Sequence, residues 1–141
     1  MAQTPSIPEA QRWLQQAESD LQAAHNDIRR CCPNWVLFKV HQALEKALVA
    51  VILCHSEAFE APVGLLGVAQ WLEAVEPKLR GLTEEVEWLH GCGVDSKATQ
   101  YPSYHPFPIT PNKAFNSVDE EGVLKRMQGV LRRLQDHVDR L

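Results

Sequence analysis

The sequence predicts an all-α fold, an antiparallel bundle of four to five helices with one long proline-rich loop before the last helix. Three observations predict this fold. Apolar residues recur at steps of three and four in several segments, which is the period of one helix face. Helix-start signals precede these segments, whereas strand patterns are weak everywhere. Most connections between the segments are short, and short connections favour antiparallel neighbours.

A first helix is expected to run to about Arg30, with residues 1–6 disordered. Ser6 and Glu9 form the pattern of a capping box, in which Ser6 accepts from an early amide and Glu9 reaches back. Pro33 then breaks the helix. The apolar face between these points has steps of three and four: Leu14, Ala17, Leu21, Ala24 and Ile28.

The second helix is predicted to be the central, buried one. Asn34 is expected as its N-cap, and residues 49–53 are apolar all round, which is typical of a buried element. Its polar residues are few and mostly early in the helix. Among them Lys39, Gln42 and Lys46 are three and four residues apart, so they share one face.

Two shorter helices are expected after a linker at residues 58–64. The third helix stops near Pro77, and the fourth begins at Thr83 with acidic residues in its first turn, where the helix dipole favours negative charge. Gly91 is expected as a left-handed cap at the end of the fourth helix. The spacing thus predicts a helical pair between the linker and the long loop.

Residues 92–116 lack a helical period and hold four of the nine prolines, which predicts a long loop. A capping box at residues 117–120 then starts the last helix, which continues to the end of the chain. The aromatic side chains of the loop are expected to pack down onto the bundle rather than extend into solvent: Tyr101, Tyr104, Phe107 and Phe115.

The composition is that of an ordinary globular protein. The 141 residues fit one domain, residues 1–141, and 45% of them are hydrophobic while 23% are charged. The net charge of −4 argues against a general binder of nucleic acid or anionic membranes, because such binding needs excess positive charge. No apolar run approaches a membrane span and no signal-peptide pattern opens the chain, so we expect a cytoplasmic protein.

The cysteines and histidines have no metal-site spacing. Cys31 and Cys32 are neighbours, no Cys-x-x-Cys pair occurs, and the spacing is not that of a disulfide framework. We expect Cys31, Cys32 and Cys54 to be buried structural thiols in a reducing compartment. The six histidines do not pair at three or four residues, and no His-Glu-x-x-His motif occurs, so no metal site is expected.

The polar face of the second helix is the first candidate binding site. Lys39 and Lys46, with Gln42 between them, have the donors to hold phosphate or base oxygens in a cleft, since a lysine ammonium is a compact charge with three donors. The alternative is structural, with Lys46 extending to solvent along the helix edge. The local pattern leaves both interpretations open.

The last helix carries a second set of candidates. Arg126, Arg133 and Arg140 are seven residues apart and form a basic stripe, which is either a phosphate- or RNA-binding face or the solvated side of an amphipathic helix. Arg132 and His137 suit a ribonuclease, in which the histidine moves a proton and the arginine stabilises charge on the phosphate. These two are five residues apart, which turns them away from each other on a straight helix.

Three stretches match one known pattern in the same order. Residues 13–24 read Trp-Leu-Gln-Gln-Ala-Glu-Ser-Asp-Leu-Gln-Ala-Ala, and residues 42–48 read Gln-Ala-Leu-Glu-Lys-Ala-Leu. Residues 93–115 run from Gly-Val-Asp-Ser through Tyr-Pro and Pro-Phe-Pro to Pro-Asn-x-x-Phe. Together they resemble the HEPN domains (higher eukaryotes and prokaryotes nucleotide-binding), and the third resembles the branch at the C-terminus of sacsin, a very large chaperone-like protein.

The resemblance implies an antiparallel helical bundle that forms a homodimer and binds a nucleoside triphosphate, GTP or ATP, without hydrolysis. Many relatives carry an arginine before the pair that is Tyr101 and Pro102 here; this chain has Gln100 there, and Lys97 is the nearest substitute. Some HEPN families are ribonucleases with an Arg-x4–6-His motif, here Arg132 to His137. The residues expected at the nucleotide are Lys39, Gln42, Lys46, Lys97, Arg126 and Arg133, with Arg29 and Arg30 as further arginines.

Three functional hypotheses compete. The leading one is a non-catalytic nucleotide-binding and dimerisation module within a chaperone-like protein. The second is a protein–protein interaction module without a physiological nucleotide, whose contact surface is the aromatic loop at residues 101–115. The third is a metal-independent ribonuclease that uses Arg132 and His137. No membrane partner is expected, and the net charge disfavours nucleic acid.

Overall fold

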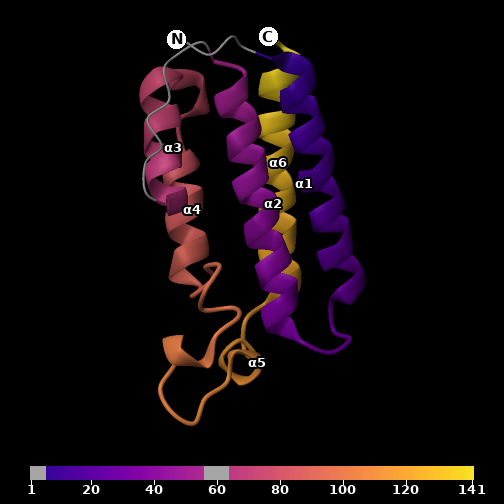
Figure 1. The fold of residues 1–141 in the computed structure, drawn as a ribbon, viewed down its shortest axis with the longest axis vertical. Helices are drawn as coiled ribbons and strands as arrows, with labels where there is room; N and C mark the ends of the chain where they lie inside the picture. The colour runs from indigo at the N-terminus through magenta and orange to yellow at the C-terminus, as the bar shows by residue number, and fades with distance from the viewer. Residues whose placement is uncertain (1–5, 56–63) are drawn as a thin grey trace.

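A computed structural model describes residues 6–55 and 64–141, and every regular element in these two ranges is a helix (Figure 1). The predicted all-α fold is therefore confirmed. None of the described helices has the length and apolar character needed to cross a membrane. The α-helices are α1 (Ile7–Asp27), α2 (Pro33–Leu53), α3 (Gly64–Val75), α4 (Leu82–Gly91), α5 (Pro111–Ala114) and α6 (Glu120–Asp139), and the 3-10 turns are η1 (Pro77–Leu79) and η2 (Pro102–Tyr104).

Helix α2 lies at the centre of the bundle. Helices α1 and α6 pack on one side of it, and the α3–α4 pair lies on the other (Figure 1). The pairs α1–α2 and α3–α4 are antiparallel, as expected from their short connections. Helices α2 and α6 run in the same direction, because the long loop after α4 returns the chain to the end of the bundle where α2 begins.

The core confirms the prediction that the second helix is buried. More than half of α2 is inaccessible to water, including Leu37, Leu44 and Leu48, which are among the largest fully buried side chains. The helix is buried on several faces because α1, α3 and α6 all contact it. Burial of one leucine side chain contributes about 1.5–3 kcal/mol, so this helix accounts for much of the hydrophobic stabilisation.

The start of α1 confirms only half of the predicted capping box. The Ser6 hydroxyl accepts from the Glu9 amide at 3.3 Å. Glu9 does not reach back; its carboxylate accepts instead from Arg12 at 2.5 Å and from the Trp13 indole at 3.1 Å. The amide of Ser6 donates to the Leu53 carbonyl at 2.9 Å, which ties the start of α1 to the end of α2. Ser6 is thus ordered, whereas residues 1–5 lie outside the described residues.

The expected N-cap of the second helix is wrong. Cys32 is the N-cap and Pro33 is the first helical residue, a position that proline favours because its missing N–H is not needed there. Asn34 is instead buried, and its side-chain amide donates to the Thr99 carbonyl at 3.0 Å. The first helix also ends at Asp27 rather than at Arg30.

Three further helix ends differ from the predicted ones. Helix α4 includes Gly91, and Gly93 is the residue with the left-handed backbone, φ +84°. Helix α4 begins at Leu82, one residue before the expected start. Helix α6 is capped by Asp119, whose carboxylate accepts from the Gly122 amide at 3.0 Å, so the capping box at residues 117–120 is not formed as predicted. The linker expected at residues 58–64 lies outside the described residues except for Gly64.

The long loop after α4 contains two short elements, η2 and α5, and is ordered by its own hydrogen bonds. The expectation that its aromatic side chains pack down is correct for Phe115, which is buried. It is wrong for Tyr101, Tyr104 and Phe107, which are exposed. The buried ring of Phe115 packs against the bundle core, and the His105 ring lies edge-on to it at 5.9 Å between centroids.

Candidate functional site

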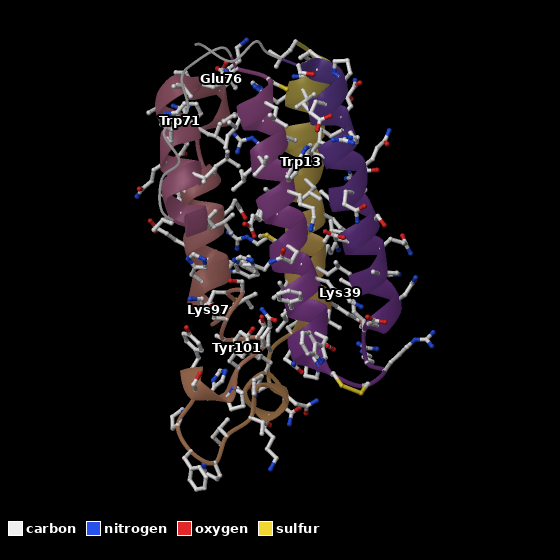
Figure 2. All side chains as sticks on the ribbon, viewed as in Figure 1. Trp13, Lys39, Trp71, Glu76, Lys97 and Tyr101 are labelled. Carbon is white, nitrogen blue, oxygen red and sulfur yellow. A yellow bond between two sulfur atoms is a disulfide. The ribbon has the colours of Figure 1, made fainter. Side chains whose placement is uncertain are left out.

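The cations predicted to hold a nucleotide do not converge on one point. Figure 2 shows Lys39 beside α1 and Lys97 below α4, on opposite sides of α2. Lys39 forms an ion pair with Asp27 of α1, and the Lys46 ammonium lies 2.7 Å from a carboxylate oxygen of Asp20. The face formed by Lys39, Gln42 and Lys46 therefore pairs two of its donors with the neighbouring helix.

The arginines of α6 hold that helix against its neighbours. Arg126 donates to both carboxylate oxygens of Glu85, at 2.8 and 3.3 Å, and its guanidinium lies 4.1 Å from the centroid of the Trp88 ring. Arg133 donates to the carbonyl oxygens of Lys78 and Arg80, at 3.0 and 2.5 Å. Arg126 therefore joins α6 to α4, and Arg133 joins α6 to η1.

Arg29 and Arg30 lie in the turn between α1 and α2. Arg29 forms an ion pair with Glu121 of α6 at 2.8 Å, and its backbone amide donates to Glu120 at 3.4 Å. Arg30 is exposed and borders a hollow of about 430 Å³ that Lys39 also borders. Arg29 thus joins the α1–α2 turn to the start of α6.

A groove of about 720 Å³ between α2, α3 and α4 is the candidate binding site. We call it the α2–α4 groove. Its wall is apolar, with Leu48 and Ile52 from α2 and Leu65 and Val68 from α3. Its volume lies within the roughly 300–1,000 Å³ of typical small-molecule sites. Polar groups that also border the groove are His41, Glu45, His90, Asp95, Ser96, Lys97 and Tyr104.

Two histidines from different helices meet at this groove. The rings of His41 and His90 are stacked with centroids 6.2 Å apart. His41 is only 5% exposed, and burial lowers its pKa to about 4; the neighbouring His90 adds to this effect and Asp95 opposes it. Within the described part of the chain, Nδ1 of His41 is buried without a hydrogen-bond partner. His41 is therefore a neutral ring with a spare polar atom at the groove.

A tight turn after α4 presents Lys97 at the rim of the groove. One carboxylate oxygen of Asp95 accepts from the amides of Lys97 and Ala98, at 2.8 and 2.7 Å. Thr99 closes the same turn, because its hydroxyl donates to the Asp95 carbonyl at 2.8 Å. Lys97 itself is exposed, and none of the ion pairs found among residues 6–55 and 64–141 involves it.

A second hollow, of about 490 Å³, lies between η1 and the end of α6. Arg132 and His137 both border it, although five residues turn them apart on the helix. His137 is half-buried, its ring is stacked on His55 with centroids 5.8 Å apart, and burial lowers its pKa. The hollow is also bordered by Glu76, Lys78, Arg133, Asp136 and Arg140, a mixture of charges in which cations predominate.

The cysteines differ from the sequence-based expectation. Cys31 is exposed, and it is bonded to Cys32 as a disulfide at the α1–α2 turn, where Figure 2 shows the sulfur–sulfur bond. Cys54 is a buried thiol, as expected, and burial raises its pKa to about 11. Across the described ranges, no three His, Cys, Asp or Glu side chains are placed to hold a metal ion.

The groove residues other than Lys97 were not predicted from the sequence. His41, His90 and Tyr104 are far apart along the chain and share no periodic pattern. The one usable signal was His41 itself, a polar residue among the apolar positions of a helix predicted to be buried. Its partner on α4 emerges only when the two helices pack together.

The comparisons with known proteins agree with this helical architecture. A family model described as the HEPN domain matches residues 10–137. The chain therefore belongs to the HEPN domain family. It is similar to human (Homo sapiens) sacsin, with 38% identity over 109 residues, which is 77% of this chain. The chain spans about 2% of the length of that relative.

Proposed function

We propose that the protein is a non-catalytic module that binds a nucleoside triphosphate, GTP or ATP, in the α2–α4 groove and forms a homodimer. The observation that carries the proposal is the groove itself. It combines an apolar wall with Lys97, a cation that forms no ion pair with the described residues, and a neutral buried histidine, His41, in a chain of the HEPN family. Small-molecule sites are usually concave and combine an apolar wall with polar groups that orient the ligand.

The groove offers each part of a nucleotide a suitable contact. Val49 and Val68, which are partly exposed, give the base and ribose an apolar surface, and Tyr104 adds an aromatic ring at the rim. The Lys97 ammonium provides a point charge for a phosphate, and Ser96 provides a hydroxyl donor beside it. His41 is neutral at physiological pH, so its ring suits contact with a base rather than with a phosphate.

Two carboxylates at the groove impose a further requirement. Glu45 and Asp95 would repel a bare triphosphate, because like charges at short range oppose binding. Mg²⁺ bound to the phosphates reduces the net negative charge of the nucleotide, and with it the repulsion from these two carboxylates. We therefore expect binding to be tighter with Mg²⁺ than with a chelator, and titrations under both conditions test this expectation.

A titration of the protein with GTP and with ATP, followed by calorimetry, tests nucleotide binding. Lys97→Ala should weaken binding about ten-fold, since a charge-assisted hydrogen bond contributes about 1.5–3 kcal/mol. Lys125→Ala is the matched control, because Lys125 is an exposed lysine of α6 that does not border the groove. Absence of heat at millimolar nucleotide, or equal affinities of the two variants, would contradict the proposal.

The face predicted from the sequence is a competing location. Lys46 borders a separate, open hollow of about 500 Å³ with Arg12 and Trp13. Lys46→Ala distinguishes the two locations: it should leave nucleotide affinity unchanged if the groove is the site and reduce it if the predicted face is. Lys39→Ala provides the same comparison at the lower end of that face.

Dimerisation is supported by the family resemblance rather than by the groove. Light scattering of the purified protein, with and without GTP, measures the mass directly. A mass twice that of the 15.9 kDa chain supports a homodimer. A concentration-independent monomer in both conditions would remove dimerisation from the proposed function while leaving nucleotide binding to be judged separately.

A ribonuclease is the second candidate function. The observation that favours it is the shared hollow of Arg132 and His137, which brings a cation and a titratable ring to one surface. An RNA cleavage assay without metal ions tests it. Cleavage that disappears in His137→Ala would support this function, and cleavage that persists in that variant would assign the activity elsewhere.

A further inference from the structure

An exposed apolar surface covers the loop between α4 and α5. Phe107 is 97% exposed, and Tyr101, Tyr104 and Ile109 are 50%, 52% and 38% exposed. We call these four residues the loop surface; Figure 2 shows one of them, Tyr101, on the loop below α4. Large apolar side chains that gather on a surface typically mark an interaction site. The bundle core does not cover these four residues, and among them only Tyr104 borders the α2–α4 groove.

The backbone beneath the loop surface is held in place. The Tyr101 amide donates to the Lys97 carbonyl at 2.9 Å, and the Tyr104 amide donates to the Tyr101 carbonyl at 3.2 Å. The Ile109 amide donates to the Pro106 carbonyl at 2.8 Å. A ring nitrogen of His105 lies 2.6 Å from the Ala98 carbonyl. The loop is therefore ordered while its apolar side chains stay exposed, and a preorganised surface loses less conformational entropy on binding.

The segment at residues 96–118, which holds the loop surface and α5, has a net charge opposite to that of the protein. Residues 96–118 contain Lys97 and Lys113 and no Asp or Glu, although the whole chain has a net charge of −4. Lys97 and Lys113 are both exposed. An acidic binding partner is attracted to this segment and repelled by the rest of the molecule, which favours docking at the loop.

From these observations we propose that the loop surface binds an acidic peptide segment of another protein, in which Asp or Glu residues are interspersed with aromatic or aliphatic ones. Aromatic side chains such as Phe107 and Tyr104 are the usual anchors of such contacts. The apolar residues of the segment pack on these anchors, and its carboxylates face Lys97 and Lys113. A preformed, ordered loop suits a flexible segment, because only one partner then loses conformational freedom.

Single-stranded nucleic acid also combines negative charge with flat rings, but the surface suits it less. Binding of a polyanion depends on releasing counterions at several phosphates, and the loop offers two lysines on an acidic protein. Ile109 adds an aliphatic contact, whereas binding to single strands relies on aromatic platforms. The peptide therefore agrees better with the residues present.

Two substitutions isolate this surface from the nucleotide site. Phe107 and Lys113 do not border the α2–α4 groove, whereas Tyr104 and Lys97 do. The pair Phe107→Ser and Lys113→Glu therefore removes the main anchor and one cation without touching the groove. Both side chains are exposed, so we expect the variant to unfold at the same temperature as the wild type.

Selection of displayed random peptides on the immobilised wild-type protein tests the proposal. We expect enriched peptides that are rich in Asp and Glu together with aromatic or aliphatic residues. Each should bind the Phe107→Ser, Lys113→Glu variant at least about ten-fold more weakly. Lys125→Glu, which makes the same charge change on α6, should leave binding unchanged.

Four outcomes would overturn the proposal. The first is enrichment that is equal on the variant, and the second is enrichment of basic or uncharged sequences. The third is tighter binding of a labelled single-stranded oligonucleotide than of any selected peptide. The fourth is a fall in the mass of the protein on Phe107→Ser, which would assign the surface to a second copy of this chain. GTP affinity of the variant is measured in parallel, so failure here is distinguishable from failure of nucleotide binding.

Discussion

His41 is a buried, titratable residue in the interior of this protein. It lies on a buried side of helix α2, and its stacked partner His90 comes from α4. Burial lowers its pKa to about 4 from an ordinary value of 6.5, because the low-polarity interior disfavours the charged ring. The unfolded chain therefore binds a proton between these two values that the folded chain does not bind.

The stability of the protein should consequently fall as the pH falls from about 6.5 toward 4. Because of this proton uptake at His41, the free energy of unfolding at about pH 5 should be about 2 kcal/mol lower than at neutral pH. Urea unfolding of the wild type and of His41→Gln at neutral pH and at about pH 5 measures it. We expect the variant to lose about 2 kcal/mol less on acidification. Identical losses would contradict a buried, neutral His41; His25→Gln, on the exposed side of α1, is the control.

Asn34 is the residue that fastens the long loop to the bundle. Its side-chain amide donates to the Thr99 carbonyl at 3.0 Å in a buried position. Asn34→Ala leaves that carbonyl without its donor, and we expect it to reduce the free energy of unfolding by about 1–3 kcal/mol. Hydrogen exchange should rise first in the turn at residues 95–101. Asn116→Ala, an exposed position, should have little effect, and equal effects of the two variants would show that the loop does not depend on Asn34.

The ends of the helices show what sequence patterns can and cannot predict at the scale of the element. Ser6 was correctly predicted as a cap, because its partner is three residues away. Asn34 was wrongly predicted as one, because a contact 65 residues distant uses its side chain. The start of α4 depends on Glu73 of the preceding helix, which accepts from the Gly81 amide and the Thr83 hydroxyl. Such contacts exist only after the elements have packed.

Helix α6 is joined to η1 by one side chain. Arg133 donates to the carbonyl oxygens of Lys78 and Arg80, so it satisfies acceptors at the end of a short helical turn. Arg133→Ala should reduce the free energy of unfolding by about 1 kcal/mol or more and leave GTP affinity unchanged. Thermal unfolding and calorimetry measure the two quantities. A loss of GTP affinity without a loss of stability would instead support the nucleotide contact expected from the family resemblance.

The whole molecule depends on α2, which every large helix except α4 contacts closely. Leu44 of this helix is fully buried and does not border the α2–α4 groove. Leu44→Ala should reduce the free energy of unfolding by about 2–5 kcal/mol, because it removes buried apolar contacts and leaves a cavity. Leu141→Ala, at an exposed position, is the control. A change of less than about 1 kcal/mol in urea unfolding of Leu44→Ala would contradict a central position of α2.

The fold was predictable from the sequence to a much greater extent than the site. The helical period of α1, α2 and α6 follows directly from local spacing, and it sets which faces are buried. The groove depends on His41, His90 and Lys97, which three separate segments supply. Lys39 and Lys46 share a predicted face, but their ion pairs with Asp27 and Asp20 depend on how α1 packs. Spacing within one helix cannot reveal either arrangement.

Mapping of amide chemical shifts during a GTP titration of the isotope-labelled protein directly tests whether the nucleotide binds in the α2–α4 groove. We expect saturable shifts at His90, Ser96 and Lys97, with little change at Gln16 and Lys46. Saturable shifts confined to Gln16 and Lys46 would contradict it and place the nucleotide on the α1–α2 face. An unchanged spectrum at millimolar GTP with Mg²⁺ would contradict nucleotide binding itself.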